Sequence, residues 1–157
     1  MKRSYEEALI KSLSRRRPYD RRVSEPFRHR LRVRYNECDP QGVVFNANYL
    51  TYFDITMGEL WRELGGYQEM VEAGVDMVVG EANILYRDAL RFDEEFEIRA
   101  TVTRLGDTSM TTDLTLDRDG TTIAEGRLRH VFIETGGGKT APIPEPIRSG
   151  LARYESE

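Results

Sequence analysis

The sequence predicts a two-layer α+β fold in which one long helix packs on one face of a five-stranded antiparallel sheet. Three observations lead to this prediction. Apolar and polar residues alternate from 27 to 35, the next segment shows helical spacing, and alternation returns in four runs between 75 and 134. A helix with an apolar stripe must bury it, and loops cannot cover it, so the sheet is expected to form the second layer.

The first strand is expected to have one buried face and one basic face. The helix that follows is expected to begin near Asn46 and to end at Gly65-Gly66, where glycine can supply a left-handed cap. Residues 67–73 suit a short second helical piece. In the strand, Phe27, His29, Leu31, Val33 and Tyr35 alternate with Arg28, Arg30, Arg32 and Arg34. The apolar stripe of the helix comprises Asn46, Leu50, Phe53, Met57, Leu60, Trp61 and Leu64.

The pattern predicts β structure from residue 75 to residue 134, and an irregular segment is expected from Gly136 onward. Asp119-Gly120 is a strong signal for a two-residue hairpin turn. The expected strands are 75–90, 96–105, 110–116 and 121–134. Gly80 is a possible bulge in the first of them, and Gly106-Asp107 forms the turn between the second and the third.

Length and composition fit one soluble, globular domain. The chain has 157 residues, of which 39% are hydrophobic and 32% are charged. No apolar stretch approaches the roughly 18 residues of a membrane-spanning helix, and the N-terminus does not resemble a secretory signal. The lone cysteine, Cys38, excludes an internal disulfide and fits the cytoplasm. The expected division is a basic arm and linker at 1–26, the folded domain at 27–146, and a C-terminal tail at 147–157.

Charge is unevenly distributed. The first 22 residues carry eight basic and three acidic side chains, a net charge of +5, and the rest of the chain carries −9. An acidic body argues against nucleic acid as the main partner. Self-pairing of an exposed sheet edge would remove that edge, so a homo-oligomer is expected.

The segment 37–49 joins the first strand to the helix and carries the most informative residue, Asp39. Free backbone N–H groups and the positive end of the helix dipole lie near it, and such groups can hold the oxygen of a polarised carbonyl. An Asp-Pro pair before a helix is also a common turn or cap. On local grounds, therefore, both a catalytic and a structural role remain open.

The order of the expected elements and several short motifs resemble the hotdog fold, and more narrowly the 4-hydroxybenzoyl-CoA thioesterase-like acyl-CoA thioesterases. This resemblance implies an antiparallel five-stranded sheet wrapped around one long central helix. The resemblance spans roughly 27–146. The motifs are Arg32-Val33-Arg34-Tyr35, Cys38-Asp39-Pro40, Gly42-Val43-Val44, Ala47-Asn48-Tyr49, Phe53 and Leu64-Gly65.

The resemblance implies hydrolysis of an acyl thioester of coenzyme A or of an acyl-carrier protein, without a metal or a bound cofactor. It implies a homodimer or homotetramer with active sites at the subunit interface. Asp39 matches the catalytic aspartate, as nucleophile or general base, and the backbone N–H of Asn46 is expected to hold the thioester carbonyl. The expected substrate-binding residues are Gly42, Val43, Val44, Phe45, Tyr49 and Phe53, although Tyr49 and Phe53 also suit simple core positions.

Two positions depart from the family pattern. Many relatives have histidine or tyrosine where this chain has Asn46, and an arginine is often found at the position of Met57. A backbone donor does not depend on its side chain, so these changes bear on the substrate more than on the reaction.

Other interpretations have less support. His29 and His130 lie in strand patterns and read as structural or surface groups, with no metal-ligand spacing. The run Gly136-Gly137-Gly138-Lys139-Thr140 lacks the first glycine of a phosphate-binding loop. Related hotdog enzymes that hydrate acyl thioesters pair an aspartate with a histidine five positions later, or a histidine with a glutamate. Val44 stands at the first position, and no histidine lies near the expected helix start. A non-catalytic subunit that binds acyl thioesters or a carrier protein remains the alternative.

Overall fold

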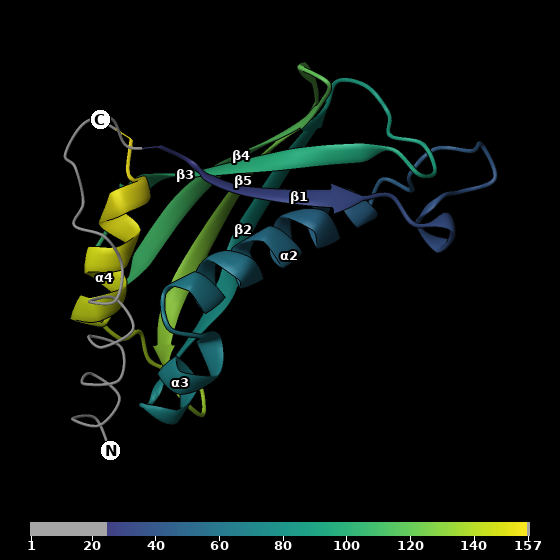
Figure 1. Cartoon of the computed structure of the whole chain (residues 1–157). Helices are drawn as coiled ribbons and strands as arrows, with labels where there is room; N and C mark the ends of the chain where they lie inside the picture. Colours follow the sequence, from purple (N-terminus) through teal and green to yellow (C-terminus); the bar gives the residue numbers. More distant parts are fainter. Residues whose placement is uncertain (1–24, 157) are drawn as a thin grey trace.

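A computed structural model describes residues 25–156 and contains one five-stranded antiparallel sheet (Figure 1). Its strands lie in the order β1-β3-β4-β5-β2, so that β1 and β2 form the two edges. This confirms the predicted α+β class and the strand count. The strands are β1 (Phe27–Arg32), β2 (Val75–Tyr86), β3 (Glu95–Leu105), β4 (Ser109–Arg118) and β5 (Thr121–Glu134).

The predicted turn chemistry is found in the sheet. Asp119 and Gly120 have φ values of 48° and 80°, which is the left-handed geometry of a two-residue hairpin between β4 and β5. In β2 the register with β5 shifts between Val79 and Glu81, which confirms a bulge at Gly80. Because of this bulge, the two halves of β2 present their side chains differently to the helix layer.

The longest helix, α2 (Asn48–Glu63), has 16 residues and runs along one face of the curved sheet (Figure 1). The helical part also includes α3 (Tyr67–Glu72) and α4 (Glu145–Leu151), so a single long central helix is not confirmed. Gly65 and Gly66 both have positive φ, as predicted. The N–H of Gly66 donates to Trp61 O at 2.9 Å and closes the C-terminus of α2.

The predicted apolar stripe of α2 is partly wrong. Asn46 lies before the helix, and Leu50 is 39% exposed. The buried face includes Tyr52 and Thr56, which the stripe left out, and Tyr49, which already suited a core position. Its members are Tyr49, Tyr52, Phe53, Thr56, Met57, Leu60 and Trp61. At the first strand, Tyr35 is 80% exposed because the chain leaves the sheet after Arg32 and forms a short 3-10 helix, η1 (Tyr35–Glu37).

Phe53 and Gly126 set how closely α2 approaches the sheet. Phe53 is fully buried, and its ring lies over Gly126 of β5. A Cβ atom at Gly126 would lie 2.4 Å from Phe53 Cε2, far inside van der Waals contact. This glycine therefore lets the first half of α2 lie directly on the sheet.

The chain after Gly136 is more regular than predicted. It forms α4 and a 3-10 helix, η2 (Ala152–Tyr154), and Ile147 and Leu151 are buried in the core. Arg148 donates to the carbonyl of Gly106 at 2.6 Å and fixes α4 beside the β3–β4 turn. A seven-residue helix that begins with Glu145-Pro146 gives little periodicity, which explains why the pattern did not reveal it.

No helix within residues 25–156 combines the length and apolar character needed to cross a membrane. Of the basic arm and linker expected at 1–26, only Glu25 and Pro26 are among the described residues, and the charged segment 1–22 lies outside them.

Candidate active site

The turn that precedes α2 is held by its own backbone. Cys38 and Val44 form an antiparallel bridge. The N–H of Asp39 donates to Val43 O, and the N–H of Gly42 donates to Asp39 O, both at 2.9 Å. Gly42 has a φ of 77°, a conformation that other residues rarely adopt, so it permits the tight reversal. Asp39 thus lies on a closed loop with fixed geometry.

The Asp39 carboxylate is half-buried, and its Oδ1 accepts a hydrogen bond from the N–H of Gln41 at 2.8 Å. This contact is an Asx turn and orients the side chain. Asp39 lies nine residues before the first residue of α2, so it does not cap the helix. A carboxylate held by one backbone donor keeps other lone pairs available for a substrate or a water molecule.

The start of α2 offers open backbone donors. The helix begins at Asn48, two residues later than predicted, and Ala47 at the N-cap provides no capping side chain. The Asn46 N–H has no hydrogen-bond acceptor among residues 25–156, whereas the Asn46 carbonyl accepts from the Tyr86 hydroxyl at 2.9 Å. An unpaired N–H at the positive end of a helix can stabilise a developing oxyanion.

Glu37 connects the turn to the helix, a role that the sequence pattern did not indicate. Its Oε2 accepts from the Tyr52 hydroxyl at 2.7 Å and from the Arg34 N–H at 2.8 Å. Its backbone carbonyl accepts from the Phe45 N–H at 2.9 Å and from Asn48 Nδ2 at 2.8 Å. Burial, together with the bond to Glu37, raises the pKa of Tyr52 well above its ordinary value. Tyr52 therefore stays a neutral donor and fixes the carboxylate of Glu37.

The expected substrate-binding residues fall into two groups. Gly42 and Phe45 are exposed and Val43 is half-buried, so these three lie at the surface of the turn. Val44, Tyr49 and Phe53 are buried in the core.

Tyr49 holds two segments that lie next to the turn. Its hydroxyl accepts from the Leu90 N–H at 3.0 Å, and its ring meets the Tyr86 ring edge to face at 5.3 Å. Burial raises the pKa of Tyr49. Neutral Tyr49 thus anchors both the 87–91 segment and Tyr86, whose hydroxyl holds Asn46.

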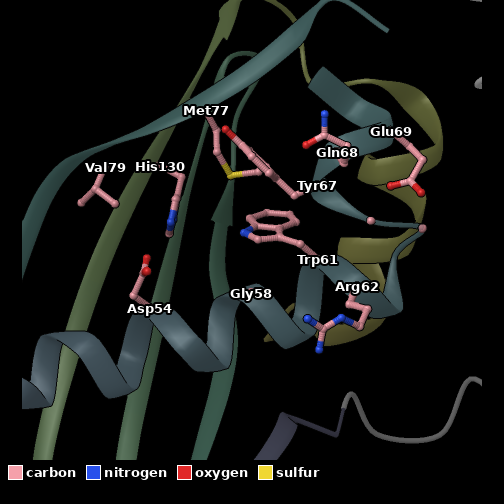
Figure 2. A pocket seen from close by; sticks show the side chains of 12 residues that line it. Asp54, Gly58, Trp61, Arg62, Tyr67, Gln68, Glu69, Met77, Val79 and His130 are labelled. Atoms are coloured by element: carbon pink, nitrogen blue, oxygen red, sulfur yellow. The ribbon is translucent and has the colours of Figure 1, made fainter. Parts of the chain in front are cut away.

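A separate cavity of about 670 Å³ lies beyond the turn, beside the C-terminal half of α2 (Figure 2). Asp39 is not among its lining residues. The lining includes Trp61 of α2, Tyr67 of α3, Met77 and Val79 of β2, and His130 of β5. Because β2 is an edge strand, this cavity borders the free edge of the sheet. Within residues 25–156, no cluster of three or more histidine, cysteine or acidic side chains could hold a metal ion.

The sheet order, the helix across one face and the turn before that helix define a hotdog-type α+β protein. The chain belongs to the Thioesterase-like superfamily, whose family model matches residues 33–151. The predicted family resemblance is thereby confirmed, and an enzyme of the thioester hydrolase class is confirmed at the level of the family.

Individual relatives agree with this membership. The chain is 27% identical over 123 residues to the acyl-CoA thioester hydrolase YbgC of Escherichia coli O6:H1, which covers 77% of this chain and 92% of the relative. A crystal structure of a hypothetical protein from Aquifex aeolicus matches with a TM-score of 0.76 and 28% identity, over 80% of this chain and 99% of that one. The structure of a gentisyl-coenzyme A thioesterase matches with a TM-score of 0.72 and 25% identity, over 79% and 98%.

Proposed function

We propose that the protein hydrolyses acyl-CoA thioesters, with Asp39 as the reacting carboxylate and the N–H of Asn46 as the oxyanion donor. The observation that carries this proposal is the paired turn. The Cys38–Val44 bridge and the bond from the Phe45 N–H to Glu37 O draw both arms of the turn together. In this pairing Asp39 lies opposite Val43, and Asn46 follows Phe45 three positions further along the same arm, so both groups belong to one loop whose backbone is fixed.

The chemistry follows from these two groups. The thioester carbonyl accepts from the Asn46 N–H, so negative charge that develops on its oxygen meets a fixed donor. Asp39 then either attacks the carbonyl carbon, giving an anhydride that water opens, or removes a proton from an attacking water. In both routes the C–S bond breaks, the thiolate leaves and takes up a proton, and the free acid is released. Coenzyme A enters as part of the substrate, and the proposal needs no other cofactor or metal.

The test replaces Asp39 with asparagine and follows thiol release from a panel of aromatic, short-chain and long-chain acyl-CoAs. We expect kcat to fall by about 10²–10⁴-fold, the usual contribution of a general base. The control is Asp113→Asn, the same chemical change on the sheet face away from α2, where Asp113 pairs only with Arg127. Near-normal hydrolysis by Asp39→Asn would refute the assignment.

We further propose that two copies pair through β2. This edge strand is twelve residues long and exposes the apolar residues Val78, Val79, Leu85 and Tyr86. Antiparallel pairing about a two-fold axis places the start of one strand beside the end of the other. Because Tyr86 holds Asn46, the turn of one subunit would then lie beside Met77 and Val79 of its partner. Val78→Glu should convert the dimer to a monomer in light scattering and lower thiol release.

The alternative, a non-catalytic acyl-thioester-binding or carrier-interacting subunit, makes a different prediction. Acyl-CoA would then raise the melting temperature without releasing thiol. The same panel presented on an acyl-carrier protein tests the second possible substrate form. The cytoplasmic location expected from Cys38 stays a prediction.

A further inference from the structure

Tyr86, the last residue of the edge strand β2, reaches the turn before α2 with its side chain. Its hydroxyl donates to the carbonyl oxygen of Asn46 at 2.9 Å, although the two residues are 40 positions apart in the sequence. The side chain of Tyr86 is 50% exposed. A hydroxyl in such a place can bond to water equally well, so this contact adds little to the stability of the fold. Its main effect is on where the backbone of Asn46 lies.

The strand and a neighbouring ring hold Tyr86 itself in place. Strand β2 is paired with β5 up to this residue. Directly after it, the N–H groups of Arg87 and Asp88 both donate to Ile123 O, at 2.8 and 3.1 Å. The ring of Tyr86 meets the ring of the buried Tyr49 edge to face at 5.3 Å. The Tyr86 hydroxyl therefore has a fixed position.

Two peptide units meet at Asn46, and each is held by its oxygen. The unit before the Cα atom carries the N–H that is proposed as the oxyanion donor, and its oxygen, Phe45 O, accepts from the Asn48 N–H at 2.9 Å. The unit after the Cα atom carries Asn46 O, which accepts from the Tyr86 hydroxyl and, at a longer 3.3 Å, from the Tyr49 N–H. Peptide units are planar, so only the φ and ψ angles of Asn46 connect the two. The bond from Tyr86 therefore restricts the rotation that would turn the Asn46 N–H away.

Helix α2 alone holds this residue weakly. The helix begins at Asn48, and its N-cap residue, Ala47, contributes no capping side chain. Asn46 lies before the helix, and the bond from the Tyr49 N–H is longer than an ordinary N–H···O bond. An oxyanion donor is effective only if it is already in place when the charge develops. A displacement of Asn46 should therefore slow the reaction without weakening substrate binding.

We propose that Tyr86 is a positioning residue for thioester hydrolysis, whose hydroxyl holds Asn46 so that the Asn46 N–H points at the developing oxyanion. The inference rests on the proposed thioesterase function and deepens it by naming a residue that acts through the oxyanion donor. Tyr86 itself does not contact the substrate. Because it ends the edge strand, it also links the donor to the strand through which two copies are proposed to pair.

The first test is Tyr86→Phe, which removes the hydroxyl and keeps the ring. We expect kcat for thiol release to fall about 3- to 10-fold, the effect of one neutral hydrogen bond in the transition state. KM should change less than about twofold. The matched control is Tyr154→Phe, because Tyr154 of η2 donates to Glu63 Oε1 at 2.8 Å at the other end of α2. Its kcat should stay unchanged, and both variants should melt within about 4 °C of the wild type.

A second substrate separates positioning from a general structural defect. In a dithioester analogue of the acyl-CoA, sulfur replaces the carbonyl oxygen, and sulfur accepts a hydrogen bond only weakly. A misplaced Asn46 N–H therefore slows the thioester and hardly affects the dithioester. The ratio of the two kcat values, thioester over dithioester, should fall about 3- to 10-fold in Tyr86→Phe and stay unchanged in Tyr154→Phe.

A third measurement does not depend on turnover. Ketone analogues of the aromatic, short-chain and long-chain acyl-CoAs, in which CH₂ replaces the thioester sulfur, keep the carbonyl and cannot be hydrolysed. In protein with ¹⁵N-labelled asparagine, the Asn46 amide proton should move downfield when a ketone binds, because this N–H gains an acceptor. At saturation the same ketone should give a smaller shift in Tyr86→Phe.

The outcomes separate the two proposals. Unchanged kcat in Tyr86→Phe, or equal slowing of thioester and dithioester, overturns the positioning role and leaves the hydrolase in place. A ketone-induced shift of Asn46 that depends on Tyr86, in a protein that releases no thiol from any acyl-CoA, supports the positioning role and refutes the hydrolase. Thiol release without any shift of Asn46 refutes Asn46 as the donor and with it the role of Tyr86. Absence of both thiol release and the shift overturns both proposals.

Discussion

Substitution by alanine should change the stability of the fold in opposite directions at two glycines, Gly126 in β5 and Gly58 in α2. At Gly126 an added methyl carbon would lie 2.4, 2.8 and 3.0 Å from three carbons of the Phe53 ring. The nearest is about 1.1 Å inside the roughly 3.5 Å at which carbon atoms pack. Phe53 is fully buried and cannot turn into solvent. We expect Gly126→Ala to destabilise the fold by about 1–3 kcal/mol, the usual cost of overpacking.

At Gly58 the same methyl group meets open space, and alanine is the better helix former. Gly58→Ala should therefore stabilise the fold by up to about 1 kcal/mol. Urea denaturation followed by fluorescence and circular dichroism measures both changes. For a chain of this size each kcal/mol corresponds to about 2–4 °C in melting temperature.

The double variant Phe53→Leu/Gly126→Ala identifies the cause. If the clash is real, Gly126→Ala costs less in the Phe53→Leu variant than in the wild type, and the coupling energy is measurable. A neutral or stabilising Gly126→Ala would show that the helix can lift from the sheet at little cost. Gly126 would then not set how closely α2 approaches the sheet.

Further predictions concern the groups beneath the turn and the buried imidazole. Tyr52→Phe removes the donor to Glu37 and leaves a mostly buried carboxylate with one bond fewer, so we expect about 1–3 kcal/mol less stability and lower kcat, measured by denaturation and thiol release. The opposite result, unchanged stability and rate, would mean that Glu37 does not hold the turn. The pKa of His130 is lowered in the folded state, so below about pH 6.5 the unfolded chain binds the extra proton more readily. The stability that depends on a neutral His130 is therefore present above pH 6.5 and is lost as the pH falls. His130→Leu should flatten the pH dependence of the unfolding free energy between about pH 5 and 7. Equal slopes in both proteins would contradict a neutral, buried His130.

The sequence predicted best those features of the fold that two or three neighbouring residues determine. The β4–β5 hairpin was predictable because Asp119-Gly120 alone supplies the turn geometry. The bulge at Gly80 and the helix end at Gly65-Gly66 were predictable for the same reason. Tyr52 was missed in the buried face of α2, because the pattern does not show that its hydroxyl finds a partner in Glu37. Helix α4 escaped because seven residues show too little periodicity.

The same distinction applies to the site. Asp39 and Asn46 are seven residues apart on one turn, so the sequence could present them as a pair. Asp54 and His130 are on different elements, and they face each other only because β5 lies second from the β2 edge and His130 is opposite Val79 in that register. The pattern identified His130 as a strand residue but contained nothing about what it faces. The register between β2 and β5 therefore had to be known before the imidazole of His130 could be placed opposite the carboxylate of Asp54.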